Sequence, residues 1–219
     1  MKLINAAFCI VILSLFVSCR SQKQPNLTKL NYQSGDLIFQ DLDCGELCDA
    51  IEKVTTGYKG KSFSHIGLVY DRVDSVFVIE AVGAGVRLTP LESFLNRNRD
   101  ENGVPKVIIG RLKKEYRKLN DSAISFAVQK RGTAYDHEFI YNNGKYYCSE
   151  LIYDAYKYAN NNQPFFQLEP MTFKDTVSHQ TLPVWETYYS KMGIDIPEGQ
   201  PGCNPAGLSR SDKLEIIWQ

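Results

Sequence analysis

The chain has 219 residues, and its 25 basic and 25 acidic side chains give a formal net charge of zero. This balance supplies no overall field for attracting nucleic acid or anionic membranes, so it argues against a nucleic-acid-binding protein. The 43% hydrophobic content excludes a disordered chain. A chain of this length suits one sizeable domain rather than two.

The first 19 residues predict an exported protein with a lipid anchor. An apolar run over residues 6–17 is too short to span a bilayer and has the length typical of a signal-peptide core. The segment that ends in Cys19 resembles the lipobox of bacterial lipoproteins, although Phe16 replaces the usual leucine. We therefore expect a signal peptide over residues 1–18, a lipidated Cys19 and a polar tether over residues 19–33. Ordinary secretion with cleavage nearby is the alternative.

After the tether, the pattern predicts short apolar strands and amphipathic helices in one domain over residues 34–219. Alternating or β-rich runs predict the strands, and apolar residues three or four apart predict the helices. Gly and Pro mark several element ends. We expect strands at 37–39, 63–70, 75–82, 86–88 and 106–112, helices at 42–55, 90–97, 120–130, 146–159 and 182–192, and a turn-rich surface tail at 198–208.

The strands at 63–70 and 75–82 are predicted to form a hairpin, because a short polar turn joins them. The middle of the chain therefore builds most of an antiparallel sheet. Together with the helices, this predicts an α+β fold.

Cys148 lies at the start of the predicted helix at 146–159. A thiol there meets unpaired backbone amides and the positive end of the helix dipole, which favour the thiolate. The thiolate is the nucleophile of cysteine enzymes, and the same amides can stabilise an oxyanion. The alternative is a small apolar core residue, which is the commoner role of a free cysteine.

His65 and Glu80 lie on the two strands of the predicted hairpin. A strand histidine flanked by small residues is a candidate general base. Glu80 is a charged residue inside an apolar strand, which is costly unless it is paired. Within the hairpin it can approach the His65 ring and stabilise the imidazolium. A structural histidine and an outward-facing glutamate are the alternatives.

The order of motifs along the chain resembles that of the YiiX/YebB-like cysteine hydrolases. The motifs are GDLIF at 35–39, SHIGLVY at 64–70, VIEA at 78–81, Tyr-Asp-x-x-Phe at 135–139, YYCSELIYDAY at 146–156 and NPAGLS at 204–209. These hydrolases belong to the permuted branch of the NlpC superfamily of papain-like enzymes, in which the histidine precedes the cysteine. The resemblance implies a papain-like fold with the nucleophile helix packed against the sheet.

Carried over residue by residue, the resemblance implies Cys148 as nucleophile, His65 as base and Glu80 as the orienting acid. Tyr135 and Tyr147 are candidates for an oxyanion donor or a pocket wall, with structural tyrosines as the alternative. No metal or other cofactor is expected.

The implied reaction is hydrolysis of an amide through a thioester. The expected substrate is a cell-envelope peptide, a peptidoglycan fragment or a related acyl amide, because lipidation would hold the protein to a bacterial membrane on its periplasmic or outer-surface side. Acyl transfer, lipid-amide hydrolysis and non-catalytic binding are the alternatives.

The other cysteines allow several pairings. Outside the cytoplasm Cys44 and Cys48 can form a disulfide, but their spacing requires a local departure from helix. A zinc site there lacks a second ligand pair. Cys203 is either free or the partner of Cys44.

Overall fold

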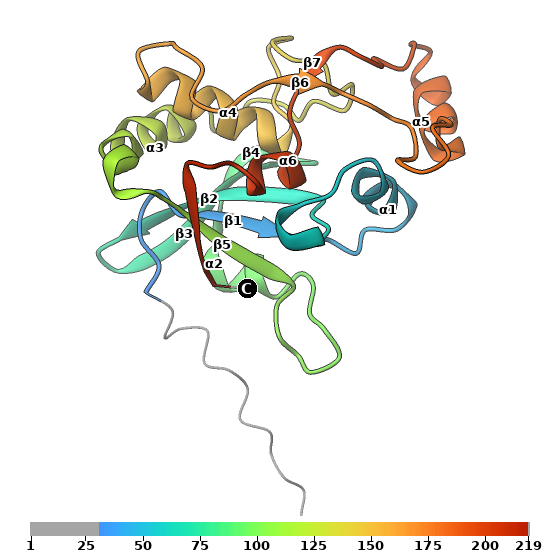
Figure 1. Ribbon diagram of the computed structural model, residues 1–219. Coiled ribbons are helices and arrows are strands. Elements are labelled where there is room, and N and C mark those ends of the chain that lie inside the picture. The colour runs from blue at the N-terminus through green and yellow to red at the C-terminus, as the bar shows by residue number, and fades with distance from the viewer. Residues whose placement is uncertain (1–30, 219) are drawn as a thin grey trace, which may run out of the picture.

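The computed structural model describes residues 31–218, and its centre is a six-stranded antiparallel sheet (Figure 1). The strand order is β4-β3-β2-β1-β5-β8. The strands are β1 (Leu37–Gln40), β2 (His65–Arg72), β3 (Ser75–Val82), β4 (Gly85–Pro90), β5 (Val107–Leu112) and β8 (Leu214–Trp218). A separate ribbon pairs β6 (Glu169–Pro170) with β7 (Pro201–Gly202). The predicted signal peptide, Cys19 and most of the predicted tether lie outside the described residues.

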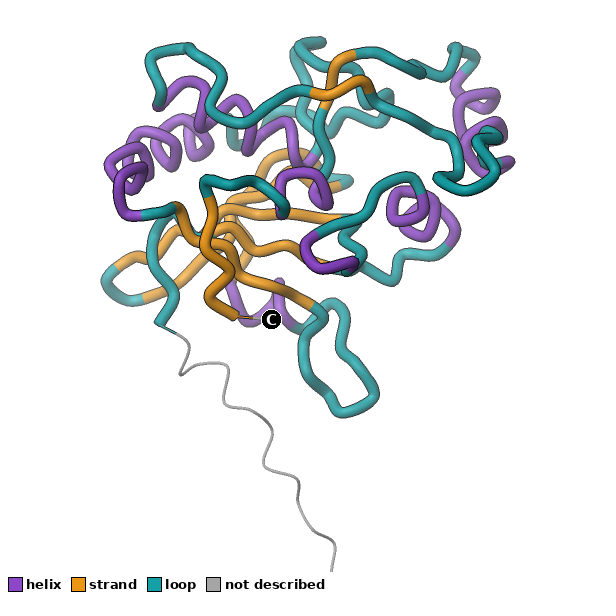
Figure 2. The backbone as a smooth tube through the Cα atoms, viewed as in Figure 1, coloured by secondary structure: helices purple, strands orange, loops and turns teal. Residues whose placement is uncertain are grey.

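Helices cover both faces of the sheet (Figure 2). They are α1 (Glu46–Lys53), α2 (Leu91–Leu95), α3 (Asn120–Gln129), α4 (Cys148–Ala159), α5 (Pro183–Met192) and α6 (Pro205–Ser209), with the 3-10 turns η2 (Tyr58–Gly60) and η3 (Lys114–Leu119). Helices α3 and α4 pack side by side, and α4 also contacts β2 and β3. Within residues 31–218, no helix combines the length and the apolar character needed to cross a membrane.

The alternation of side chains along the strands divides the apolar interior into two clusters. Leu68 and Ile79 pack in the larger cluster, which includes the buried faces of α3 and α4. Val69 and Val78, one residue along each strand, pack with Phe94 of α2 in the smaller cluster. Successive side chains of a strand point to opposite faces, so in the middle of β2 and β3 each face has its own apolar cluster, one toward α4 and one toward α2.

The predicted antiparallel α+β architecture and the predicted hairpin are confirmed. β2 pairs with β3 in antiparallel register, with Leu68 opposite Ile79. Most helix positions also agree, although the helix expected over 42–55 is the shorter α1. A leucine-, isoleucine- and valine-rich middle segment is therefore enough to predict the sheet, because half-buried strands require that composition.

The prediction of a surface tail over residues 198–208 is correct for residues 198–201, which are exposed, and wrong for the rest. Gly202, Cys203, Ala206 and Leu208 are buried. The segment forms β7 and α6, and the chain then returns to the sheet as its edge strand β8. Pro and Gly residues mark turns, but turns say nothing about whether a segment packs against a distant helix.

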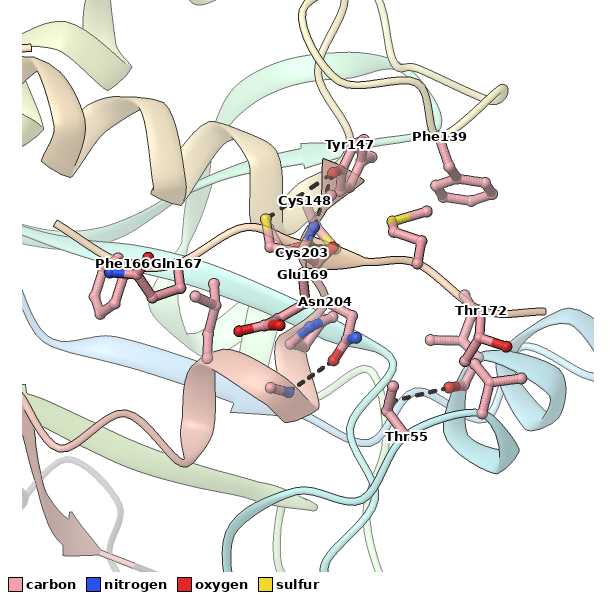
Figure 3. A pocket seen from close by; sticks show the side chains of 18 of the residues that line it. Thr55, Phe139, Tyr147, Cys148, Phe166, Gln167, Glu169, Thr172, Cys203 and Asn204 are labelled. Atoms are coloured by element: carbon pink, nitrogen blue, oxygen red, sulfur yellow. Dashed lines mark hydrogen bonds between the residues drawn. The ribbon is translucent and has the colours of Figure 1, made fainter. Parts of the chain in front are cut away.

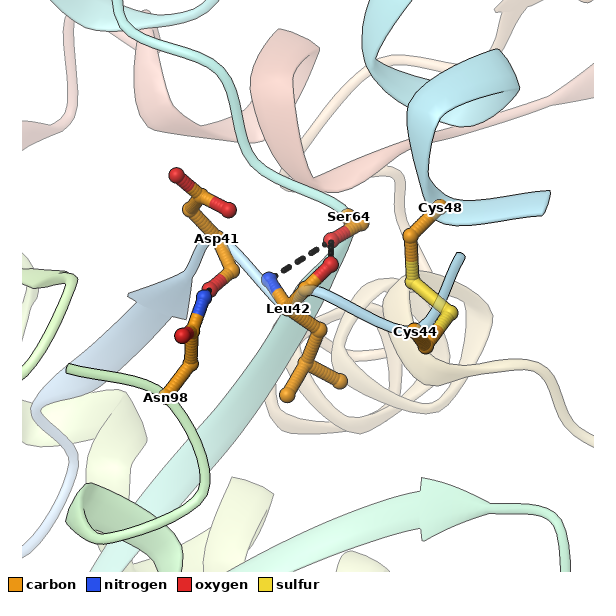
Figure 4. The surroundings of a disulfide bond; sticks show 6 residues. All are labelled: Asp41, Leu42, Cys44, Cys48, Ser64 and Asn98. Carbon is orange, nitrogen blue, oxygen red and sulfur yellow. Dashed lines mark hydrogen bonds between the residues drawn. A yellow bond between two sulfur atoms is a disulfide. The ribbon is translucent and has the colours of Figure 1, made fainter. Parts of the chain in front are cut away.

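Cys44 and Cys48 form a disulfide, with their Cα atoms 5.4 Å apart (Figure 4). Cys44 precedes α1, and Gly45 between them adopts φ 81°, in the left-handed region that glycine tolerates. This is the local departure from helix that the spacing requires. Cys148 and Cys203 are free and buried.

Candidate active site

Cys148 is the first residue of α4, because the preceding Tyr147 has an extended backbone and acts as the N-cap. Three residues after the cap, the buried carboxylate of Glu150 accepts a hydrogen bond from the backbone N–H of Asn142 at 2.8 Å. This bond attaches the loop before α4 to the helix end that carries the thiol. Burial, together with the charges of Asp154 and Asp136, raises the pKa of Glu150 to about 8, although the backbone hydrogen bond from Asn142 opposes this shift.

His65 opens β2, and its Nε2 lies 2.6 Å from Oε2 of Glu80 on β3. Both side chains are buried. Continuing the register from the Leu68–Ile79 pair places Glu80 diagonally across from His65 on the same face of the sheet. The hairpin predicted from the sequence therefore brings this pair together.

The Cys148 thiol lies near the same imidazole, close enough to raise its pKa, and α4 packs against β2. Glu80 occupies Nε2, which leaves Nδ1 as the ring nitrogen able to exchange a proton with the thiol. Burial lowers the pKa of His65, but hydrogen bonds to Cys148 and Glu80 outweigh burial and raise this pKa to about 9. The site thus favours an imidazolium between two acidic groups.

Glu80 is held by more groups than His65. Arg97, in the turn after α2, donates from Nη1 to Oε2 at 2.6 Å and from Nη2 to Oε1, and Thr89 on β4 donates to Oε1. Arg87 lies farther away, with its Nε 3.6 Å from Oε1. Burial raises the pKa of Glu80, but the hydrogen bonds and charges of Arg97 and His65 hold it well below its usual range.

The sequence did not identify Arg97 and Thr89 as residues of the site. The one available signal was the cost of a carboxylate inside an apolar strand, which requires a cation somewhere in the fold. That cost does not identify the cation. Arg97 follows Glu80 by 17 residues, and only the packing of α2 against β3 and β4 brings it there.

Tyr135 and Phe139 belong to a loop that closes beside Cys148. A bridge between Tyr135 and Tyr146 joins its ends, and the buried Asp136 accepts hydrogen bonds from two backbone N–H groups inside it. Phe139 has φ 54°, a conformation that an aromatic residue rarely adopts. Burial and the neighbouring charge of Cys148 raise the pKa of Tyr135 well above its usual value, so its hydroxyl stays protonated.

Tyr147 and Ser149, on either side of the nucleophile, both bind the backbone of Cys203. The Tyr147 oxygen accepts from the Cys203 N–H at 3.2 Å, and the Ser149 hydroxyl donates to the Cys203 carbonyl at 2.9 Å. Gly202 passes so close that a Cβ there would lie 3.1 Å from the Tyr147 oxygen. These contacts attach the segment between β7 and α6 to the start of α4.

A cavity of about 570 Å³ opens at Cys148 (Figure 3). Its walls come from α1, the start of α4, the β6–β7 ribbon and α6, so it joins segments far apart in sequence. Aromatic and apolar side chains predominate in the lining, including Phe139, Phe166, Phe173, Trp185, Met171 and Leu208. Charged groups such as Glu169 and Arg210 also reach it. Tyr135 and Tyr147 both line it, as the prediction of a pocket wall requires.

Comparison with known proteins gives consistent matches. Residues 31–218 match the family described as permuted papain-like amidase enzymes, YaeF/YiiX, of the C92 family. The protein YiiX of Escherichia coli strain K12, described as uncharacterized, is 31% identical over 152 residues, which are 68% of this chain and 67% of that protein. The crystal structure of metalloprotein YiiX from Escherichia coli O157:H7 superimposes with a TM-score of 0.68 and 23% identity, covering 85% of this chain and 97% of that chain.

Proposed function

This chain belongs to the C92 family of permuted papain-like amidases, and from that premise we propose that it uses Cys148, His65 and Glu80 to hydrolyse an amide bond in a cell-envelope peptide. The papain-like fold and the amidase type follow from the family. The assignment of the three residues rests on one observation: the imidazole of His65 on β2 binds the carboxylate of Glu80 on β3, and the Cys148 thiol of α4 lies near enough to raise the pKa of that imidazole.

In the first step, the Cys148 thiolate attacks the amide carbonyl carbon while His65 holds the proton that the thiol has given up. The tetrahedral intermediate collapses, the C–N bond breaks, and His65 gives its proton to the leaving nitrogen. An amine departs, and a thioester to Cys148 remains. The raised pKa of His65 suits this step, because the base must be protonated before it can act as the acid.

In the second step, water attacks the thioester carbonyl and loses a proton to His65. The C–S bond breaks, a carboxylic acid departs, and the thiol is restored by the proton on His65. Glu80 stays ionised throughout and orients the ring by accepting from Nε2.

Two groups are placed to stabilise the oxyanion of each intermediate. The backbone N–H of Cys148 lies in the first turn of α4, where no partner exists within the helix. Tyr135 lines the same cavity as Cys148 and keeps its hydroxyl proton, so it can donate. Tyr147 is the weaker candidate, because its oxygen already accepts from the N–H of Cys203.

The cavity supports a substrate with an apolar or aromatic group next to the scissile amide. Its aromatic lining at Phe139, Phe173 and Trp185 offers stacking and apolar contact. Charged groups such as Glu169 and Arg210 can meet the termini or charged side chains of a short peptide.

Placement in the envelope is supported by two independent features. The first 19 residues have the pattern of a lipoprotein leader ending at Cys19. The Cys44–Cys48 disulfide is of a kind that persists outside the cytoplasm. Labelling with a radioactive fatty acid tests the anchor: we expect incorporation that Cys19→Ala abolishes, and incorporation that survives this substitution would contradict lipidation at Cys19.

The related protein from Escherichia coli O157:H7 is described as a metalloprotein, and the residues here do not fit that chemistry. Within residues 31–218, no group of three or more His, Cys, Asp or Glu side chains is placed to hold a metal ion. The donors beside Cys148 are also committed, since His65 binds Glu80 and Glu80 binds Arg97. No step above is therefore routed through a metal ion.

Incubation with muropeptides, aminoacyl amides and N-acyl lipids, analysed by mass spectrometry, tests the proposal. One class should release a carboxylic acid and an amine, and Cys148→Ala should abolish the release. His65→Ala should slow it by about 10²- to 10⁴-fold, the usual contribution of a general base. Products joined to an added amine would identify an acyltransferase instead. Hydrolysis that survives Cys148→Ala would rule out this cysteine as nucleophile.

A further inference from the structure

One oxygen of the Glu80 carboxylate accepts hydrogen bonds from two cationic side chains. Its Oε2 accepts from Nε2 of His65 at 2.6 Å and from Nη1 of Arg97 at 2.6 Å. The second guanidinium nitrogen of Arg97 binds Oε1, which Thr89 also contacts. Arg97 therefore holds both oxygens, and its cation sits one carboxylate oxygen away from the imidazole.

The reaction makes this arrangement consequential. His65 is an imidazolium before the leaving nitrogen takes its proton and a neutral ring afterwards. A buried carboxylate that relied on His65 alone would lose its counter-charge at that moment, and this would oppose release of the proton. Arg97 keeps its charge throughout, because a guanidinium does not deprotonate in proteins.

Aromatic packing, as well as hydrogen bonding, holds the guanidinium of Arg97 in place. Its guanidinium lies over the ring of Phe94 at 5.0 Å, and the same ring lies 5.7 Å from the His65 ring. Phe94 is fully buried in the smaller apolar cluster. One aromatic side chain of α2 thus fixes the spacing of the two cations that share Glu80.

We propose that Arg97 is a positioning residue of this site, which clamps both oxygens of Glu80 and balances its charge in both protonation states of His65. The inference rests on the proposed function. Arg97 touches no substrate and acts through Glu80. By holding half of the carboxylate's hydrogen-bonding capacity, it also keeps His65 from becoming too weak an acid to protonate the leaving nitrogen.

Arg87 supplies a matched control. Both arginines form ion pairs with Glu80, but Arg87 approaches only Oε1, at 3.6 Å, and its side chain is 47% exposed against 19% for Arg97. Solvent screens an exposed charge, so removal of Arg87 should leave His65 nearly unaffected. The charged or polar groups that face the pair are thus Cys148, Thr89, the two arginines and the buried Gln40, which lies opposite His65 on β1 and donates to the Phe94 carbonyl.

The direct test is the titration of His65, followed by NMR in protein labelled with ¹⁵N-histidine. The chain has three histidines, and the other two are exposed, so they report any global change between variants. Arg97→Gln should move the His65 midpoint upward by about one pH unit or more, the size expected for loss of a nearby charge. Arg87→Gln should move it by less than about 0.3 unit.

Either of two results would overturn the proposal: an unchanged midpoint in folded Arg97→Gln, or equal shifts in the two arginine variants. Arg97→Lys keeps the charge but loses the two-pronged grip. It should hold the His65 midpoint within about 0.5 unit of the unmodified protein. In Arg97→Lys, alkylation of Cys148 by iodoacetamide should be several-fold slower than in the unmodified protein. Alkylation at the full rate would show that the two-pronged grip on Glu80 is irrelevant.

A measurement on the unmodified protein decides the matter even if Arg97→Gln fails to fold. With ¹³C-labelled glutamate, the Glu80 carboxyl signal should keep its ionised position while His65 titrates. A move to the protonated position would mean that Arg97 does not balance the charge. None of these readouts needs turnover, so failure to find an amide substrate would count against the proposed function and leave this inference standing.

Discussion

The two halves of the site differ in the chemistry of their side chains. The half carried by the sheet places His65 and Glu80 in a buried network of charges, with Arg97 and Thr89 bound to the carboxylate. The half carried by α4 places Cys148 at the mouth of a largely apolar cavity. Charge is concentrated around the imidazole and its carboxylate, and apolar surface is concentrated in the cavity where the proposed substrate would bind.

This difference suggests how the two halves could vary independently. The sheet half is paired strand to strand and admits little change without leaving a buried charge unpaired. The cavity draws its walls from α1, the β6–β7 ribbon and α6, which are joined by loops. Loops on a rigid scaffold tolerate substitution, so specificity can change there while the chemistry is kept.

The largest expected effect comes from removing the buried carboxylate of the half carried by the sheet. Glu80→Ala leaves Arg97 mostly buried with no carboxylate, and loss of one partner from a buried ion pair costs about 3–5 kcal/mol. We expect the free energy of unfolding to fall by that amount in urea denaturation, and amide hydrolysis to be lost with it. His65→Ala is the control: Arg97 and Thr89 still hold Glu80, so stability should change less while hydrolysis is lost equally. Equal destabilisation by both changes would contradict this picture.

The next effect concerns the half carried by α4: Glu150, near the start of this helix, should make the free energy of unfolding depend on pH. Burial raises the pKa of this carboxyl to about 8 in the folded protein, from an ordinary value near 4.5. Between these values the folded state binds a proton that the unfolded state has lost, so stability falls as pH rises. We expect a fall of about 3 kcal/mol between pH 5 and pH 8 from this group.

Glu150→Gln should remove most of that slope, because glutamine can accept the same hydrogen bond from the Asn142 N–H without titrating. Urea denaturation of both proteins at several pH values measures the difference. A slope that persists in Glu150→Gln would assign it to another group, of which His65 is the first to examine: its raised pKa makes stability fall between pH 6.5 and about 9.

The smallest effect sharpens the comparison within the cavity half. Tyr147→Phe removes the oxygen that accepts from the N–H of Cys203, and we expect a loss of about 1 kcal/mol in the free energy of unfolding with little change in kcat. Tyr135→Phe should do the opposite and lower kcat about tenfold or more at nearly unchanged stability. Denaturation together with steady-state kinetics separates the two, and a larger kcat effect from Tyr147→Phe would reverse their roles.

Several parts of this arrangement could be predicted from the sequence. The hairpin of β2 and β3 follows from two β-rich runs and a polar turn, and it is enough to bring Glu80 near His65. The helix that carries Cys148 follows from its apolar spacing, although it starts two residues later than predicted because Tyr147 is extended. These features depend on contacts between near neighbours in the chain, which composition and periodicity record directly.

Only the tertiary structure decided the rest. In the folded protein Arg97 is the cation that binds both oxygens of Glu80, and Cys203 lies between Tyr147 and Ser149. The second half of the segment expected to cross the surface, from Gly202 to Leu208, packs into the fold. Each of these contacts joins residues whose separation carries no periodic signal, and each is fixed by how α2, α4 and α6 pack on the sheet. A sequence states that a buried carboxylate needs a partner, and packing alone determines which side chain is within reach.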